Sequence, residues 1–253
     1  MLGVIDFEKT EPLNQNSDVN SILEKAADAA AASESEASSN SDSNVNLMPT
    51  IEDINAAVAS NDDVALTRHF DQLASVPQLV PHFWAATKAA KERFDQESQL
   101  HHLQSKQQQQ QQRVFESAEE FAIAVRQRLL SLSLPAQIEI LAAKNRFDTP
   151  LDGDLAKAAV AEHTKAGIGA ESLPSGALER LSALLDAYEL KFGWRFAHQL
   201  GNDSTHENII EAIERRLAND QLTELTVGIE QVSRIVANRL GAIEQYLESL
   251  GAR

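Results

Sequence analysis

A carboxylate and an imidazole stand next to each other at Glu162-His163, in a segment whose pattern predicts a helix from Leu155 to Ala166. Gly167-Ile-Gly169 ends this helix, and a pocket can open beside such a break. An imidazole with a pKa near 6.5 exchanges protons at neutral pH, which suits acid–base chemistry. Taken alone, the pair is more typical of a solvated helix face.

Other residue combinations exclude several kinds of chemistry. The sequence has no P-loop, no G-x-G-x-x-G, no G-x-S-x-G and no H-E-x-x-H motif. His101 and His102 are adjacent and would point about 100° apart on a helix, so they cannot share a metal. Asp152 and Asp154 lack the spacing of a calcium loop. Since there is also no cysteine, we expect no metal site.

Composition and charge limit the partners of the chain. The formal net charge of −16 over 253 residues argues against a nucleic acid or an anionic membrane as the main partner. No apolar run approaches the roughly 18 residues of a membrane span. The N-terminus has neither the basic region of a secretory signal nor the arginines of a transit peptide, so we expect a cytoplasmic protein.

Apolar spacing and capping signals predict an all-α fold, a single non-repeating bundle of about eight or nine helices. Residues 1–48 read as a disordered, acidic, low-complexity tail, and 49–253 as the helical domain, with a polar Gln-rich insertion at about 95–113. The predicted helices are Thr50 to about Ser60, one capped by Asn61, His82 to Phe94, one after Ser117, one from Pro135, Leu155 to Ala166, one capped by Ser175, one after a capping box at Ser204, and a last one with apolar positions from Leu222 to Leu247.

The last third of the chain carries several motifs in a fixed order. They are Tyr188-Glu-Leu-Lys-Phe-Gly193, then Ile209-Ile-Glu-Ala-Ile-Glu-Arg-Arg-Leu-Ala-Asn219, then Glu224, and finally Arg239-Leu240. In this order the motifs resemble the family of decarboxylases that act on 2-oxo-4-hydroxy-4-carboxy-5-ureidoimidazoline (OHCU). Weaker likeness extends back to Thr50.

The resemblance implies an all-helical carboxy-lyase that needs no cofactor and processes a small ureidoimidazoline-like molecule. Such an enzyme follows urate oxidation in purine catabolism and yields (S)-allantoin by decarboxylation and protonation on one face. The resemblance also implies a homodimer packed through helices.

The chain departs from the family at the positions that carry the chemistry. The family's A-H-P-D-L motif aligns with Ala143-Lys-Asn-Arg-Phe147, so Lys144 stands where the family has its catalytic histidine. The family's S-x-x-E-Q becomes Ala159-Val-Ala-Glu-His163, which keeps only Glu162. The F-G-F-P-F stretch becomes Phe192-Gly-Trp-Arg-Phe196, and the arginine expected near Leu200-Gly201 is absent.

If the chain is active, the resemblance assigns roles to these residues. Glu162 would orient the substrate, Lys144 would bind its carboxylate and His163 would supply the proton. A lysine with an ordinary pKa of about 10.4 is a poor proton donor at pH 7 unless desolvation lowers that pKa. The expected substrate-binding residues are Phe192, Trp194, Arg195 and His198.

Two other interpretations stay open. The substitutions also fit a catalytically degenerate family member that serves as a binding or scaffolding module, because fold does not fix function. The chain could also be an unrelated helical protein, since motifs such as Lys191-Phe-Gly193 are ordinary helix-end chemistry. The enzyme hypothesis requires Lys144, Glu162 and His163 to converge on one cavity.

Overall fold

Helices form most of the chain that the computed structural model describes, which comprises residues 48–102, 113–149, 156–165, 175–201 and 204–251. Within these residues there are ten α-helices, one 3-10 turn and no strand, so the all-α prediction is confirmed and the expected number of helices was slightly too low. The tail before Met48 and the glutamine tract Gln107–Gln112 lie outside the described residues.

The helices follow one another along the chain with short connections. They are α2 (Ile51–Ser60), α3 (Asp63–Leu73), η1 (Pro77–Leu79), α4 (Val80–His102), α5 (Ala118–Leu130), α6 (Leu134–Ala142), α7 (Ala156–Lys165), α8 (Ser175–Phe192), α9 (His206–Arg216), α10 (Gln221–Arg239) and α11 (Ile243–Ser249). The polar segment expected as an insertion is helical as far as His102, where it prolongs α4.

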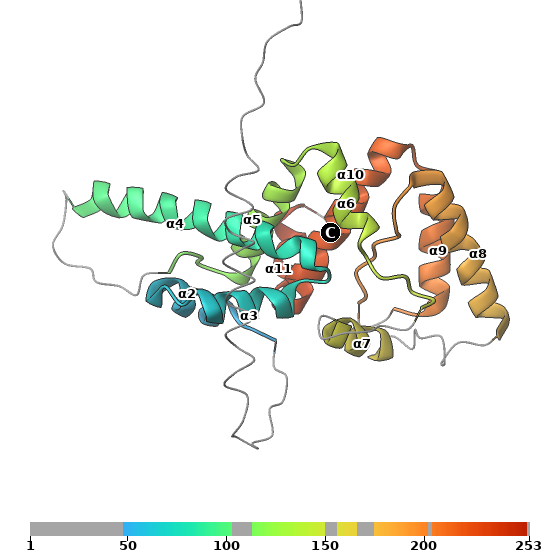
Figure 1. Ribbon diagram of the computed structural model, residues 1–253, viewed down its shortest axis with the longest axis horizontal. Coiled ribbons are helices and arrows are strands. Elements are labelled where there is room, and N and C mark those ends of the chain that lie inside the picture. The colour runs from blue at the N-terminus through green and yellow to red at the C-terminus, as the bar shows by residue number, and fades with distance from the viewer. Residues whose placement is uncertain (1–47, 103–112, 150–155, 166–174, 202–203, 252–253) are drawn as a thin grey trace, which may run out of the picture. The chain divides into compact units, whose positions relative to one another are not determined.

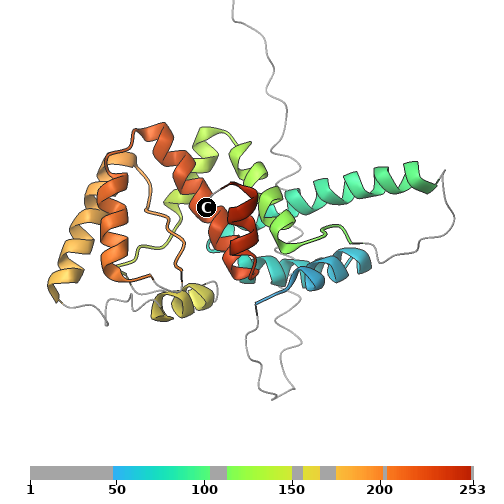
Figure 2. The ribbon, with the colours of Figure 1, turned by 180° about the vertical axis from the view of Figure 1, so that it is seen from behind.

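Helix α10 is the centre of the packing, because it contacts α5, α6 and α11 (Figure 1). Helix α5 also packs against α4, and α8 lies side by side with α9, as the reverse view shows again (Figure 2). Buried leucine, isoleucine, valine and phenylalanine side chains from α2 to α10 form one continuous core. This core fixes the end of α6 beside α10, where the candidate site begins.

A glycine permits the close contact between α6 and α10. A Cβ atom at Gly228 on α10 would lie 2.7 Å from a methyl group of Leu141, which is fully buried near the end of α6. Distances this short force a side chain to shift. The absence of a side chain at Gly228 therefore sets how closely the residues after α6, including Lys144, approach α10.

Three expectations about helix ends were wrong. Asn61 does not start α3 but ends α2 in the left-handed conformation, with φ of 53°, and Asp62 caps α3. The capping box before α9 is formed by Thr205 and Asn208, one residue later than expected. The long final helix is divided into α10 and α11 because Gly241, with φ of 69°, ends α10 with a helix-terminating turn.

Other end signals are confirmed. Thr50 and Asp53 form the predicted capping box of α2. Gly193 adopts φ of 82° directly after α8, as a glycine stop requires. None of the described helices is long and apolar enough to cross a membrane.

The contact at Gly228 generates a stability prediction. Gly228→Ala should lower the free energy of unfolding by an amount of the order of 1 kcal/mol, because overpacking Leu141 outweighs the gain in helix propensity. Gly176→Ala on α8, where a new Cβ meets nothing within 4 Å, is the matched control and should not destabilise the protein. Urea unfolding of both variants checks this, and an equal gain in stability for both would contradict it.

Candidate active site

A buried polar cluster ties α8, α9 and α10 together behind the site. Glu224 is fully buried and accepts hydrogen bonds from Tyr188, from Arg216 Nε at 2.8 Å and from Asn219 Nδ2 at 2.7 Å. Arg216 Nη1 also donates to the Ala197 carbonyl at 2.6 Å. Tyr188, Arg216, Asn219 and Glu224 therefore form a structural clamp that joins α8, α9 and α10.

Lys191 belongs to the same clamp. Its Nζ donates to the carbonyl oxygens of Leu217 at 2.6 Å and of Asn219 at 2.8 Å, which lie just beyond the end of α9. A cation there satisfies carbonyls that the helix leaves unpaired. Lys191 therefore fixes the end of α8 to the end of α9.

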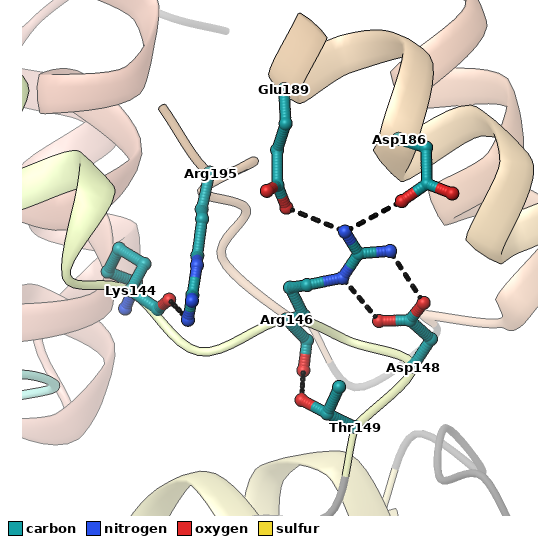
Figure 3. A network of polar contacts seen from close by, with 7 residues as sticks. All are labelled: Lys144, Arg146, Asp148, Thr149, Asp186, Glu189 and Arg195. Carbon is teal, nitrogen blue, oxygen red and sulfur yellow. Dashed lines mark hydrogen bonds and ion pairs between the residues drawn. The ribbon is translucent and has the colours of Figure 1, made fainter. Parts of the chain in front are cut away.

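Arg146 holds the loop after α6 against α8 (Figure 3). Its guanidinium makes two parallel hydrogen bonds of 2.8 Å to Asp148 and donates through Nη1 to Asp186 at 2.9 Å and to Glu189 at 3.0 Å. These hydrogen bonds lower the pKa of Asp148. An arginine shared by three carboxylates gives the loop a defined path, and Lys144 lies at the start of that loop.

Arg195 fixes the backbone of Lys144 directly. Its Nη1 donates to the Lys144 carbonyl oxygen at 2.7 Å (Figure 3). The amide of Lys144 donates to the Leu141 carbonyl at 3.2 Å, so the main chain is held on both sides. Arg195 was expected to bind substrate, but it does not line the pocket; it positions Lys144 from behind.

A small pocket lies between the loop after α6, helix α7 and the end of α10, and its cavity volume is about 30 Å³. Five of its lining residues can carry charge or exchange protons, namely Lys144, Glu162, His163, His198 and Arg239. Its apolar walls include Phe147, Phe196 and Ile235. The required convergence of Lys144, Glu162 and His163 on one cavity is therefore present.

The amine of Lys144 is the unusual group in this pocket. The residue is only 8% exposed, and no hydrogen bond or ion pair to its Nζ is present within the described part of the chain. Burial lowers the pKa of Lys144 from 10.5 to about 7, helped by the charge of Arg239 and opposed by that of Glu162. At neutral pH the Lys144 amine therefore populates both its charged and its neutral form.

Arg239 and Glu162 form a two-pronged ion pair across the pocket. Arg239 Nε donates to Glu162 Oε1 at 2.9 Å and Nη2 donates to Oε2 at 3.1 Å. Arg239 Nη1 also donates to the Leu73 carbonyl at 3.0 Å, which connects α10 to the end of α3. The pair places α7 over the end of α10 and accounts for the orientation of Glu162.

Both histidines in the pocket are partly buried and stacked on phenylalanines. The ring of His163 stacks on Phe147 with centroids 5.0 Å apart, and that of His198 stacks on Phe196 at 5.7 Å. Burial lowers the pKa of His163, and burial together with nearby arginines lowers the pKa of His198 to about 4. At pH 7 the imidazole of His198 is therefore uncharged, and burial favours the neutral form of His163.

Two expected lining residues lie in the core instead. Phe192 and Trp194 are buried against each other, with ring centroids 5.7 Å apart, and neither lines the pocket. The aromatic wall is supplied by Phe196 and Phe147 instead. Sequence spacing alone cannot say which side of an irregular segment faces the cavity, and residues 193–201 form such a segment.

Eight of the twelve lining residues were not foreseen as site residues, Arg239 and Ser75 among them. The sequence analysis named Arg239 only as part of a motif. Its place near the end of the last long helix could have marked it as a candidate site residue. Ser75, between α3 and η1, gave no signal because it comes from a distant part of the chain. Among the described residues no group of three or more His, Cys, Asp or Glu could hold a metal ion.

Comparison with known proteins identifies the class of this helical domain. A model of the OHCU decarboxylase family matches residues 81–241, which is more than half of the 253-residue chain. The chain therefore belongs to the OHCU decarboxylase family. No curated protein matches it in sequence.

Two solved structures are similar to parts of the chain. The crystal structure of an (S)-allantoin synthase aligns with 24% identity and a TM-score of 0.37, covering 51% of this chain and 39% of that one. The crystal structure of an OHCU decarboxylase in the presence of (S)-allantoin aligns with 18% identity and a TM-score of 0.39, covering 51% and 81% of the two chains. This chain thus spans well under half of the allantoin synthase.

The buried amine generates a prediction about stability and pH. The pKa of Lys144 is lower in the folded state than in the unfolded chain, so between about pH 7 and pH 10.5 the unfolded state binds more protons and stability rises with pH. Lys144→Met should therefore raise the free energy of unfolding by a few kcal/mol at pH 6, and this gain should shrink toward pH 10.

Urea unfolding across this pH range measures the difference between the variant and the native protein. Lys88→Met, which removes an exposed lysine on α4, is the control and should show no such dependence. A gain from Lys144→Met that is the same at every pH would show that Lys144 keeps an ordinary pKa.

Proposed function

We propose that the chain is a cofactor-free decarboxylase that acts on OHCU, or on a closely related ureidoimidazoline, in the degradation of urate. The observation that carries the proposal is the position of Lys144. Its amine, with a pKa of about 7, lines the same pocket as Glu162, His163 and Arg239 in a member of the OHCU decarboxylase family.

Decarboxylation needs an acid at one face of the substrate. Loss of carbon dioxide leaves an electron pair on carbon, spread into the neighbouring imine and carbonyl groups, and a proton must then reach that carbon. An acid is most effective when its pKa lies near the working pH. In the proposal Lys144 donates this proton as an ammonium ion, in place of the histidine that the family has there.

The other pocket residues bind and orient in this scheme. Glu162 still has lone pairs beyond those that Arg239 occupies, and it accepts hydrogen bonds from substrate N–H groups. Neutral His163 donates or accepts at a substrate carbonyl or ureido group, since burial lowers its pKa. His198 lies farther along the same wall and contributes in the same way.

Three residues act through position. Arg195 holds the Lys144 carbonyl, while Phe192 and Trp194 pack against each other in the core. A ureidoimidazoline is larger than a cavity of about 30 Å³, so binding it requires the lining side chains to move apart. The substrate's carboxylate would then lie near Arg239 and Lys144, the two basic groups of the pocket.

Turnover of freshly generated OHCU tests the proposal. The native protein should form (S)-allantoin faster than buffer does, as measured by circular dichroism. Lys144→Met should lower kcat/KM by roughly 100-fold or more, as expected for loss of a positioned acid. Lys88→Met should leave the rate unchanged. Formation of (S)-allantoin at the buffer rate with the native protein would contradict the proposal and favour a binding or scaffolding module.

The pH profile separates the two candidate proton donors. With Lys144 as the acid, kcat/KM should fall as pH rises through about 7, because the ammonium form is lost. With His163 as the acid, the fall should come at a lower pH, because burial lowers the pKa of His163 from the ordinary value of histidine. A profile measured between pH 5 and pH 9 at constant ionic strength decides between these outcomes.

A further inference from the structure

The pocket contains polar groups whose hydrogen-bonding capacity is not used. The amine of Lys144 has no hydrogen bond or ion pair within the described residues, although it is largely buried. The hydroxyl of Ser75, a residue that is 7% exposed and comes from the opposite end of the sequence, is buried without a hydrogen-bond partner. Both residues line the same cavity.

Unsatisfied buried polar groups are costly, and a site that gathers them is suited to a polar ligand. Arg239 adds to this capacity. A guanidinium has five N–H donors, and the described residues accept hydrogen bonds from its Nε, Nη1 and Nη2, one bond from each. Arg239 and Ser75 can therefore donate hydrogen bonds to a carboxylate. The negative charge of Glu162 neutralises only one of the two basic side chains of the pocket, Lys144 and Arg239.

The size of the cavity restricts the ligand. The pocket has a cavity volume of about 30 Å³. One water molecule needs roughly 10–15 Å³ of such volume, so the cavity has room for about two or three waters. The closed pocket therefore admits a ligand of only a few non-hydrogen atoms. The walls of Phe147, Phe196 and Ile235 are apolar, so the polar ends of such a ligand must face Lys144, Ser75 and Arg239.

A buried lysine beside a second cationic group is a nucleophile for carbonyl carbons, because desolvation and charge repulsion favour the neutral amine. Lys144 satisfies both conditions, since burial and Arg239 act on it together. An exposed lysine such as Lys88 satisfies neither. The pocket thus joins a nucleophilic amine to carboxylate donors in a small space, which favours an acid of two or three carbons and requires only a small outward shift of the lining side chains to admit it.

We propose that this pocket binds small 2-oxo acids and that the Lys144 amine forms an imine with their carbonyl carbon. The lone pair of Nζ attacks the carbonyl carbon and forms a C–N bond, while the carbonyl oxygen takes a proton and becomes a hydroxyl group. The hydroxyl then leaves as water, and the nitrogen loses its remaining protons to give the imine. The amine and the oxo acid are thereby converted to the imine and one water, with no change in oxidation state.

This activity goes beyond the proposed decarboxylation, because it uses the neutral amine and a different, smaller ligand.

Reductive trapping of the imine tests the proposal. The full chain is incubated with glyoxylate and cyanoborohydride at pH 7, and tryptic peptides are analysed by mass spectrometry. Lys144 should gain the mass of a carboxymethyl group at least about tenfold faster than Lys88, because at this pH about half of Lys144 is neutral, against less than about 0.1% of an ordinary lysine, and this excess outweighs the lower nucleophilicity of a less basic amine.

Two further measurements distinguish binding of the ligand's carboxylate from the reactivity of the Lys144 amine alone. Glycolate, which has the carboxylate but no carbonyl, should protect Lys144 from glyoxylate. Ser75→Ala should slow trapping of glyoxylate at Lys144 by roughly tenfold. The same variant should react with acetaldehyde, which has no carboxylate, at the native rate.

Labelling of Lys144 no faster than Lys88 would overturn the proposal. Labelling that glycolate does not slow, or an equal effect of Ser75→Ala on glyoxylate and acetaldehyde, would overturn the carboxylate site. The assay needs no ureidoimidazoline, so its outcome is independent of whether the chain turns over OHCU.

Discussion

The site depends on one buried cation, Arg239 at the end of α10. A guanidinium that is almost entirely removed from water must be paired, and the partners of Arg239 come from two helices. Glu162 reaches it from α7, the carbonyl of Leu73 reaches it from α3, and the pocket with Lys144 lies beside it. The same charge that brings these segments together also disfavours a second positive charge on Lys144, and so links the architecture to the chemistry.

Around this pair the rest of the domain acts as support. The clamp of Tyr188, Arg216 and Glu224 fixes α8, α9 and α10 to one another. Arg146 and Arg195 then determine the path of the loop that carries Lys144. The motif residues are thus mainly structural, and the chemistry lies in a small number of side chains that they position.

Local signals predicted the helices well, because apolar spacing and capping residues act within a few residues of the chain. The ends were less certain. Asn61 and Gly241 both adopt left-handed conformations that terminate helices, and whether asparagine starts or ends a helix depends on the dihedral angles it adopts. The division at Gly241 was missed because the apolar pattern continues from α10 into α11.

The site was predictable only in part. Motif alignment pointed to Lys144, Glu162, His163 and His198, and all four line the pocket. Ser75 could not be found, since it reaches the cavity through tertiary packing from a segment without a motif. The pKa of Lys144 was equally out of reach, because it follows from burial and from the nearness of Arg239, neither of which is written in local sequence.

The central claim is that Lys144 is a buried amine poised to exchange a proton at neutral pH. An NMR titration of the protein with ¹³C-labelled lysine side chains measures this directly, and Lys144→Arg identifies the signal. We predict that the Lys144 Cε resonance titrates near pH 7, well below the pKa of about 10.4 that lysine has in model peptides. A Lys144 resonance that titrates together with the exposed lysines would contradict the account.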